Sequence, residues 1–192
     1  MSRLPDTAGP PAWLEQALRA DTLRWQYLQQ VRQQLGSGFW PAAGFVRNLV
    51  WDQQHGYRQA TPLQDIDVIY LDADCTEPYY EQHYQHQLHA RLAAAWQVRN
   101  QARMAQQHGH PPYRSCAEAI GYWPETATCY AVRVDEHDQL HWLAPLGWAP
   151  LFARQIQRNP AFSGDDASWQ RRLQRKNWRQ RWPQLQLEPN NQ

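Results

Sequence analysis

The stretch "AAGFVRNLVWDQQHGYRQATPLQDIDVIYLD", residues 42–72, holds the pattern that decides the fold. Near its start, a turn of small residues that includes Gly44 precedes an apolar segment, and this predicts a helix from about residue 45 to residue 54. Near its end, β-branched and aromatic residues over 65–71 predict a buried strand. The order turn, helix, loop, strand therefore stands within about thirty residues.

Two aspartates stand on the predicted strand. Side chains alternate along a strand, so Asp65 and Asp67 point to one face while Ile66 points to the other. Two carboxylates side by side repel each other and are costly beside apolar neighbours unless a cation joins them. Mg²⁺ or Mn²⁺ bound by this pair also binds substrate phosphates, so we predict a metal site at Asp65 and Asp67.

The turn upstream supplies groups that bind anions. Gly44 lets the backbone approach a ligand closely, and the start of the following helix presents free N–H groups to a phosphate. Arg47, in the first turn of that helix, can add a bidentate guanidinium. The turn and the aspartates together predict a site for a phosphorylated ligand and its metal.

These residues resemble the signature of nucleotidyltransferases of the DNA polymerase β superfamily, in which a small-residue turn opens a helix and precedes a strand bearing Asp-x-Asp. The tRNA nucleotidyltransferase type has the turn Gly-Gly-x-Val-Arg-Asp. The segments "AGFVRN", "DIDVIYLD", "WQVRNQARM", "PPYRS", "YWPETAT" and "APLGW" are similar to a bacterial family of nucleotidyltransferase-like proteins. That resemblance covers roughly residues 38–182.

The resemblance implies an α+β fold, with a nucleotidyltransferase-type mixed β-sheet flanked by helices and with N- and C-terminal helices. It implies Mg²⁺-dependent (or Mn²⁺-dependent) transfer of a nucleoside monophosphate from an NTP to a hydroxyl acceptor. Protein, RNA and small metabolites all remain open as acceptors. The residues implied as catalytic and metal-binding are Asp65 and Asp67, and those implied as nucleotide-binding are Gly44, Arg47, Asn48, Asn100 and Arg103.

Two positions of the turn differ from the tRNA type. Ala43 stands where the first glycine would be, and we expect one glycine to suffice if Ala43 has an ordinary backbone conformation. Asn48 stands where that type has aspartate. Asn100 and Arg103, three residues apart at a strand-to-helix junction, are expected to face one pocket, although they could equally tie the helix start to the sheet.

The third carboxylate of the superfamily is missing from its usual neighbouring strand. That strand is "WQVRN", and it offers Gln97 and Arg99, one of which we expect to approach the metal cleft. Asp72 and Asp74 are excluded, because seven or more residues of strand span over ~20 Å. Asp135 stays open. The missing acid leaves two alternatives to an enzyme: a non-catalytic nucleotide-binding or regulatory module, and a nucleic-acid-binding protein.

Composition bounds the remaining classes. Apolar residues make up 42% and the net charge is +1, so neither wholesale disorder nor a general attraction to nucleic acid is indicated. We predict a disordered leader over residues 1–11 and a single domain over 12–192. Three widely spaced cysteines, with no signal peptide and no long apolar run, predict a soluble cytoplasmic protein without membrane contact.

Other patterns predict the remaining elements. We expect two helices over 11–35, a helix over 77–95, a hairpin from 126–135 and 140–145, and helices over 147–157 and 164–182. The last helix, rich in arginine and tryptophan over 169–182, gives the best candidate for a weak nucleic-acid contact. His83, His86 and His89 are interpreted as a solvated helix face rather than a zinc site. Glu125 is interpreted as part of a turn rather than of the site.

Overall fold

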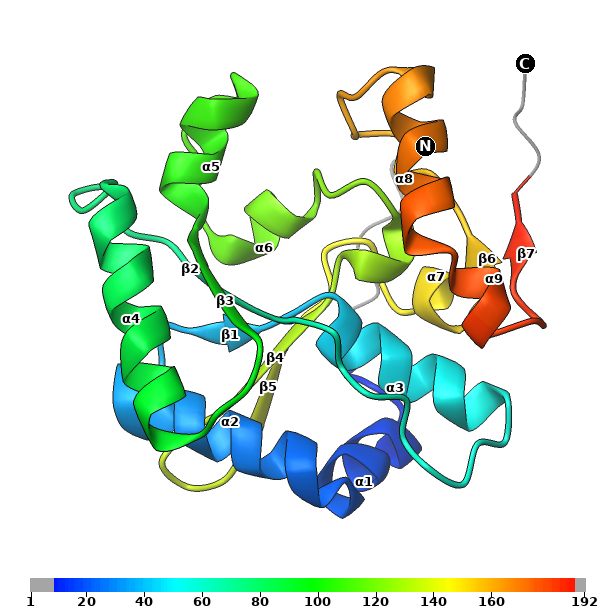
Figure 1. Ribbon diagram of the computed structural model, residues 1–192, viewed down its shortest axis with the longest axis horizontal. Helices are drawn as coiled ribbons and strands as arrows, with labels where there is room; N and C mark the ends of the chain where they lie inside the picture. Colours follow the sequence, from blue (N-terminus) through cyan, green and yellow to red (C-terminus); the bar gives the residue numbers. More distant parts are fainter. Residues whose placement is uncertain (1–8, 189–192) are drawn as a thin grey trace.

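A computed structural model of the protein describes residues 9–188 (Figure 1). Its central sheet has the order β1-β2-β3, formed by Trp40–Pro41, Ile66–Tyr70 and Trp96–Asn100. Strand β1 runs antiparallel to β2, and β2 runs parallel to β3. The α4 helix, Pro78–Arg91, provides the crossover that a parallel pair requires. The predicted α+β fold with a mixed sheet is confirmed.

A hairpin extends this sheet. Strands β4 (Ala131–Val134) and β5 (Leu140–Leu143) pair antiparallel, and the predicted turn over 136–139 joins them. A β-bridge between Ala42 and Ala131 connects the hairpin to the residue that follows β1. A separate short pair, β6 (Gln155–Ile156) and β7 (Gln186–Leu187), runs parallel. Residues 186–187 thus lie beside a segment about thirty residues earlier in the sequence.

Helices surround the sheet, and α1 and α2 lie below it in Figure 1 while α5 and α8 stand on opposite sides of the view. Several helices begin at residues whose side chains accept a hydrogen bond from the first turn, namely Asp21, Asn100, Ser115 and Asp165. Within residues 9–188, no helix is long and apolar enough to cross a membrane. The remaining helices are α1 Ala12–Ala20, α2 Thr22–Leu35, α3 Gly44–Gln54, α5 Gln101–His108, α6 Cys116–Ile120, η1 Thr126–Thr128, α7 Ala149–Phe152, α8 Asp166–Lys176 and α9 Trp178–Arg181.

Three predicted elements differ from the structure. The strand expected over 126–135 starts only at Ala131, because residues 126–128 form a 3-10 turn in which Thr128 Oγ1 donates to the carbonyl of Glu125. The helix expected over 147–157 is the single turn α7, followed by β6. The helix expected over 164–182 breaks at Asn177, whose φ of 42° is one that asparagine tolerates. The leader expected over residues 1–11 falls mostly outside the described residues.

Ala43, directly before α3, has a strained backbone conformation. Its backbone has φ 53° and ψ −114°, where glycine is strongly favoured. The condition under which one glycine would suffice, an ordinary conformation at Ala43, is therefore not met. The strain persists because the Ala43 N–H donates to the Tyr130 carbonyl at 2.9 Å, while its own carbonyl accepts from the Arg47 N–H at 2.9 Å. The hydrogen bonds to Tyr130 and Arg47 hold the backbone of Ala43 in this conformation despite its cost.

We expect Ala43→Gly to stabilise the protein by about 1 kcal/mol, since relieving about 1–3 kcal/mol of strain outweighs the roughly 0.5–1 kcal/mol that glycine loses in chain entropy. The measurement is urea unfolding of the metal-free protein. Ala42→Gly is the matched control, because Ala42 is fully buried without a positive φ and should lose stability. A loss at Ala43 as large as that at Ala42 would show that the turn is unstrained.

Candidate functional site

A cleft of about 820 Å³ opens at β2 and β3 and is bounded by α3, by the segment from α5 to η1, and by α8. Its size lies within the range of sites for small molecules and cofactors. The residues that line it come from positions 43 to 176, so distant parts of the chain form it together. They are Ala43, Gly44, Arg47, Asp65, Asp67, Ile69, Gln97, Arg99, Gln101, Met104, His108, His110, Tyr113, Tyr122, Trp123, Pro124, Thr128, Phe162, Ser163, Gly164, Ser168, Arg172, Arg175 and Lys176.

The carboxylate pair faces this cleft. Asp65 lies directly before β2 and Asp67 is the second residue of the strand. Burial, and then the neighbouring charge of Asp65, raise the pKa of the Asp67 carboxyl to about 6. The carboxylates of Asp65 and Asp67 repel each other when both are ionised. Their oxygens are suitable ligands for a divalent cation, which would relieve this repulsion. Within residues 9–188, no cluster of three or more His, Cys, Asp or Glu side chains forms a larger metal site.

The N-terminus of α3 meets the same cleft at Gly44. The N–H groups of Phe45, Val46 and Arg47 already donate to the carbonyls of residues 42 and 43. Among the described residues, the Gly44 N–H is therefore the one at this helix start without a backbone acceptor. A Cβ at Gly44 would lie 3.3 Å from Arg47 Nη2, which shows that the arginine folds back over the glycine. Glycine thus leaves room for the guanidinium.

Arg47 is a buried cation beside the carboxylates. Its guanidinium lies 4.9 Å from the ring centres of both Trp51 and Trp178. Its Nε and Nη2 donate to Asn48 Oδ1 at 3.2 and 2.9 Å. Burial lowers the pKa of Arg47 to about 10, so the group remains charged at neutral pH. Within the described chain no carboxylate lies at ion-pairing distance from Arg47, which leaves its remaining donors for an anion in the cleft.

Gln97 lies where the sequence led us to expect it. The β2–β3 register pairs Asp67 with Gln97, and Gln97 and Arg99 both line the cleft. Gln97 therefore stands beside Asp67 on the strand where the resemblance implies a third acid, and an amide oxygen can coordinate a cation without carrying charge. Asp135, the other acid left open, instead accepts hydrogen bonds from His141 at 2.7 Å and from the His137 N–H at 2.9 Å. It is absent from the cleft lining.

The structure does not bring Asn100 and Arg103 into the cleft. Asn100 is 1% exposed, and its amide binds the Asp72 carbonyl at 2.7 Å, the Cys75 carbonyl at 2.9 Å and the Ala102 N–H at 3.1 Å. Arg103 pairs with Glu81 across two bonds of 2.8 and 2.5 Å. Both side chains use their polar groups inside the protein: Asn100 joins the start of α5 to the loop after β2, and Arg103 joins α5 to α4.

Three basic residues of α8 complete the charged part of the cleft, and the sequence-based site did not include them. Lys176 Nζ lies 4.0 Å from Asp65 Oδ2, and burial lowers the pKa of this lysine. Arg172 also lines the cleft but is held by the buried Glu125, with 2.9 Å between Nη2 and Oε2. Arg175 is the third. Their one signal in the sequence is the basic run over 169–182, which by itself gives only a candidate for a weak nucleic-acid contact.

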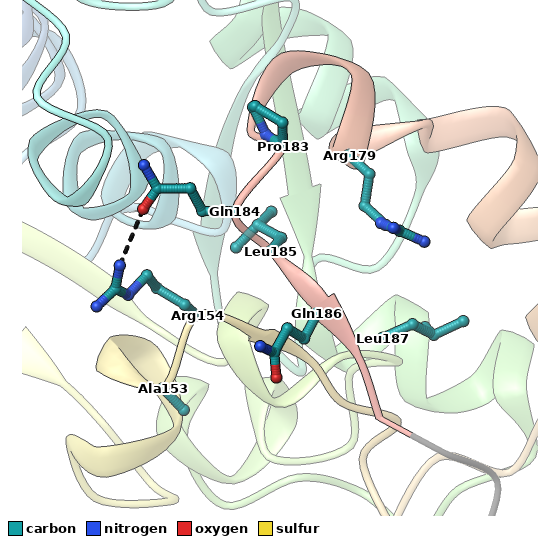
Figure 2. Close-up of a pocket in the computed structure, with 8 residues that line it drawn as sticks. All are labelled: Ala153, Arg154, Arg179, Pro183, Gln184, Leu185, Gln186 and Leu187. Carbon is teal, nitrogen blue, oxygen red and sulfur yellow. Dashed lines mark hydrogen bonds between the residues drawn. The ribbon is translucent and has the colours of Figure 1, made fainter.

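A second hollow lies away from the carboxylates, between the ends of α7 and β7 (Figure 2). Figure 2 shows Arg154 bonded to Gln184, with 2.9 Å between Nη1 and Oε1. Its lining includes Arg179 and Pro183 but no carboxylate, histidine or cysteine. The hollow has no group for metal or acid-base chemistry, and the cleft at Asp65 and Asp67 remains the candidate site.

Two comparisons with known proteins place the protein in the nucleotidyltransferase superfamily. The chain belongs to a family described as nucleotidyltransferase, whose model matches residues 30–187. A solved NMR structure, described as revealing a CCA-adding enzyme head domain, is similar to it with a TM-score of 0.80. The two share 26% sequence identity over 95% of this chain and 98% of the other. No curated protein matches the sequence.

Proposed function

We propose that the protein transfers a nucleoside monophosphate from an NTP to a hydroxyl acceptor, with Asp65 and Asp67 holding Mg²⁺ or Mn²⁺. The observation that carries the proposal is the buried, charged Arg47 that faces the cleft beside the aspartates without an ion-pair partner among the described residues. Burying a cation is costly, and among the described acidic residues Arg47 has only the longer-range attraction of Glu125, Asp67 and Asp65 to offset that cost. Phosphate oxygens would supply negative charge and hydrogen-bond acceptors in direct contact.

Each group of the cleft has its own role in the proposed transfer. Arg47 and the Gly44 N–H bind phosphate oxygens, and Lys176 and Arg175 balance the charge of the departing pyrophosphate. The acceptor oxygen forms a bond to the α-phosphorus, while the bond between that phosphorus and the oxygen bridging to the β-phosphate breaks. When bound, Mg²⁺ supplies positive charge that polarises the α-phosphate and lowers the pKa of the acceptor hydroxyl. Gln97 cannot take the acceptor's proton, which passes to solvent.

A second candidate, a non-catalytic nucleotide-binding module, is favoured by one specific feature. Gln97 occupies the register position beside Asp67 at which a third acid would stand. Loss of a general base typically costs about 10²–10⁴-fold in rate while leaving binding intact. The acceptor class stays open among protein, RNA and small metabolites, and a weak nucleic-acid contact through residues 169–182 remains a proposal.

The test is calorimetric titration of each NTP into the full chain with Mg²⁺ or Mn²⁺, followed by a pyrophosphate-release assay with each class of acceptor. Transfer predicts metal-dependent binding and stoichiometric pyrophosphate. Metal-dependent binding without pyrophosphate release under any acceptor favours the non-catalytic module. Absence of any metal-dependent NTP binding would overturn both candidates, and salt-dependent oligonucleotide binding would then favour the nucleic-acid role.

A further inference from the structure

The cleft contains an aromatic cluster that the phosphate and metal chemistry does not use. It consists of His110, Tyr113, Tyr122 and Phe162, all of which line the cleft. Ring contacts join the first three: Tyr113 and Tyr122 stack at 5.6 Å and 24°, and His110 lies 4.8 Å from Tyr122. The cluster comes from the α5–α6 and α6–η1 connections and from the segment before α8.

A hydrogen bond between two buried or half-buried members of the cluster, Tyr113 and His110, holds it in place. The Tyr113 hydroxyl lies 2.5 Å from His110 Nδ1, and Tyr113 is 9% exposed. Tyr122, in contrast, is 36% exposed and lines the cleft. A rigid ring with an open surface in a cleft is pre-organised to stack on a planar ligand, because little side-chain freedom is lost on binding.

The segment before α8 contributes the fourth ring of the cluster. Phe162 lines the cleft from the segment before α8, and its ring lies so close to Gly164 that a Cβ there would be 2.2 Å from it. Ser163 of the same segment contacts His110, with 3.3 Å between Oγ and Nε2. Asn159 anchors the segment by donating to the carbonyls of Gly121 and Trp123 at 2.6 and 2.9 Å. These contacts tie the segment that carries Phe162 to His110 and to the residues on either side of Tyr122.

The four members of the cluster are aromatic side chains, and the Arg158 guanidinium lies 5.8 Å from the centre of the Phe162 ring. Asp65, Asp67, Arg47 and Lys176, in contrast, interact among themselves. One cleft thus combines a site for phosphates with neutral rings and a few polar edges, His110 and Ser163 among them. This combination matches the phosphates and the base of a nucleotide, because an aromatic side chain can stack on the face of any of the four bases.

We propose that the aromatic cluster is a stacking subsite for a nucleobase, with Tyr122 as its principal platform. The inference rests on the proposed function, which places phosphates at the charged part of the same cleft. The base belongs either to the bound NTP or to a nucleotide at the acceptor's end. A volume of about 820 Å³ has room for a nucleotide and part of a second reactant.

The experiment compares ligands with and without a base, using the full chain and Mg²⁺. ATP, GTP, CTP, UTP, inorganic tripolyphosphate and a short single-stranded RNA with a free 3′ hydroxyl are each titrated into wild type, Tyr122→Leu and Tyr122→Phe. The matched control is Tyr79→Leu, because Tyr79 is 66% exposed on α4 and does not line the cleft. Stacking of one base corresponds to about a 5- to 100-fold change in affinity.

If the base is that of the donor, Tyr122→Leu weakens NTP binding about 5- to 20-fold, Tyr122→Phe restores it, and tripolyphosphate binds equally to all variants. If the base is that of the acceptor, the same pattern appears for the RNA and not for the NTPs. Unchanged affinity of Tyr122→Leu for every ligand overturns the inference, as does a Tyr122→Phe variant as weak as Tyr122→Leu. Failure of wild type to bind tripolyphosphate counts instead against the proposed phosphate site.

Discussion

Asp65→Asn combined with Asp67→Asn is expected to abolish Mg²⁺-dependent nucleotide binding while making the metal-free protein more stable. The two effects have one cause. The pair faces a cleft, and burial together with mutual repulsion raises the pKa of Asp67 to about 6, so ionising both carboxylates costs free energy until a cation binds. Neutral amides remove the cost and the cation site together. Calorimetry with NTP and Mg²⁺, and urea unfolding without metal, measure the two effects.

The raised pKa of Asp67 also predicts how the free energy of unfolding changes with pH. The unfolded carboxyl has a pKa near 3.8 and the folded Asp67 one of about 6, so the folded protein holds the proton more tightly between these values. Stability contributed by the protonated form is present at low pH and is lost as pH rises from about 4 to about 6. A shift of about two units corresponds to at most about 3 kcal/mol. Asp67→Asn should flatten this part of the curve.

Asp74→Asn is the matched control, because Asp74 is an exposed aspartate just beyond β2 that does not line the cleft. It should change neither nucleotide binding nor the stability curve. A double variant that unfolds more easily than wild type at pH 7 would instead assign the aspartates a structural role. Intact Mg²⁺-dependent NTP binding in the double variant would remove the metal site from the proposal.

Gln97→Glu is expected to tighten Mg²⁺ binding and to raise any transfer activity by about 10²–10⁴-fold, the usual contribution of a positioned general base. The register places residue 97 beside Asp67 on the face that lines the cleft, so a carboxylate there would join the existing pair. Without metal, the same substitution should destabilise the protein by adding a third negative charge. Pyrophosphate release and a Mg²⁺ titration of the wild type and the variant measure the gain.

Two control variants separate this effect from a general change in charge. Gln16→Glu makes the same change at an exposed position of α1 and should leave metal affinity unaltered. Gln97→Met removes the amide oxygen but keeps the side-chain length, and should weaken Mg²⁺ binding if that oxygen is a ligand. Unchanged metal affinity in both Gln97 variants would show that residue 97 takes no part in the site.

Local patterns made the positions of the residues at the centre of the candidate site predictable from sequence. Strand alternation placed Asp65 and Asp67 on one face, and the turn at Gly44 with Arg47 one helical turn later marked the start of α3. The parallel neighbour strand carrying Gln97 also followed from a strand, helix, strand order. Such features depend on residues close in sequence or on the regular geometry of one sheet.

Contacts between distant segments were not predictable in this way. Lys176 Nζ lies 4.0 Å from Asp65 Oδ2, although more than a hundred residues separate them in the sequence. No local sequence pattern predicts this contact. Asn100 was ambiguous because an asparagine at a strand end can bind a ligand or cap a helix, and only the positions of Asp72 and Cys75 decide which. The positive φ at Ala43 follows from its bond to Tyr130, which a single sequence does not reveal.

The bond from Trp182 Nε1 to Asp52 Oδ1, 2.7 Å long, joins the end of α9 to α3 and has a consequence for biosynthesis. Trp178 and Trp182 pack on Trp51, and Trp178 also covers the Arg47 guanidinium. A ribosome releases the N-terminal part of a chain first, so the strand with Asp65 and Asp67 emerges long before the segment that completes its surroundings. A nascent chain therefore completes the surroundings of its candidate nucleotide site only after Trp178 and Trp182 have emerged, more than a hundred residues after Asp67.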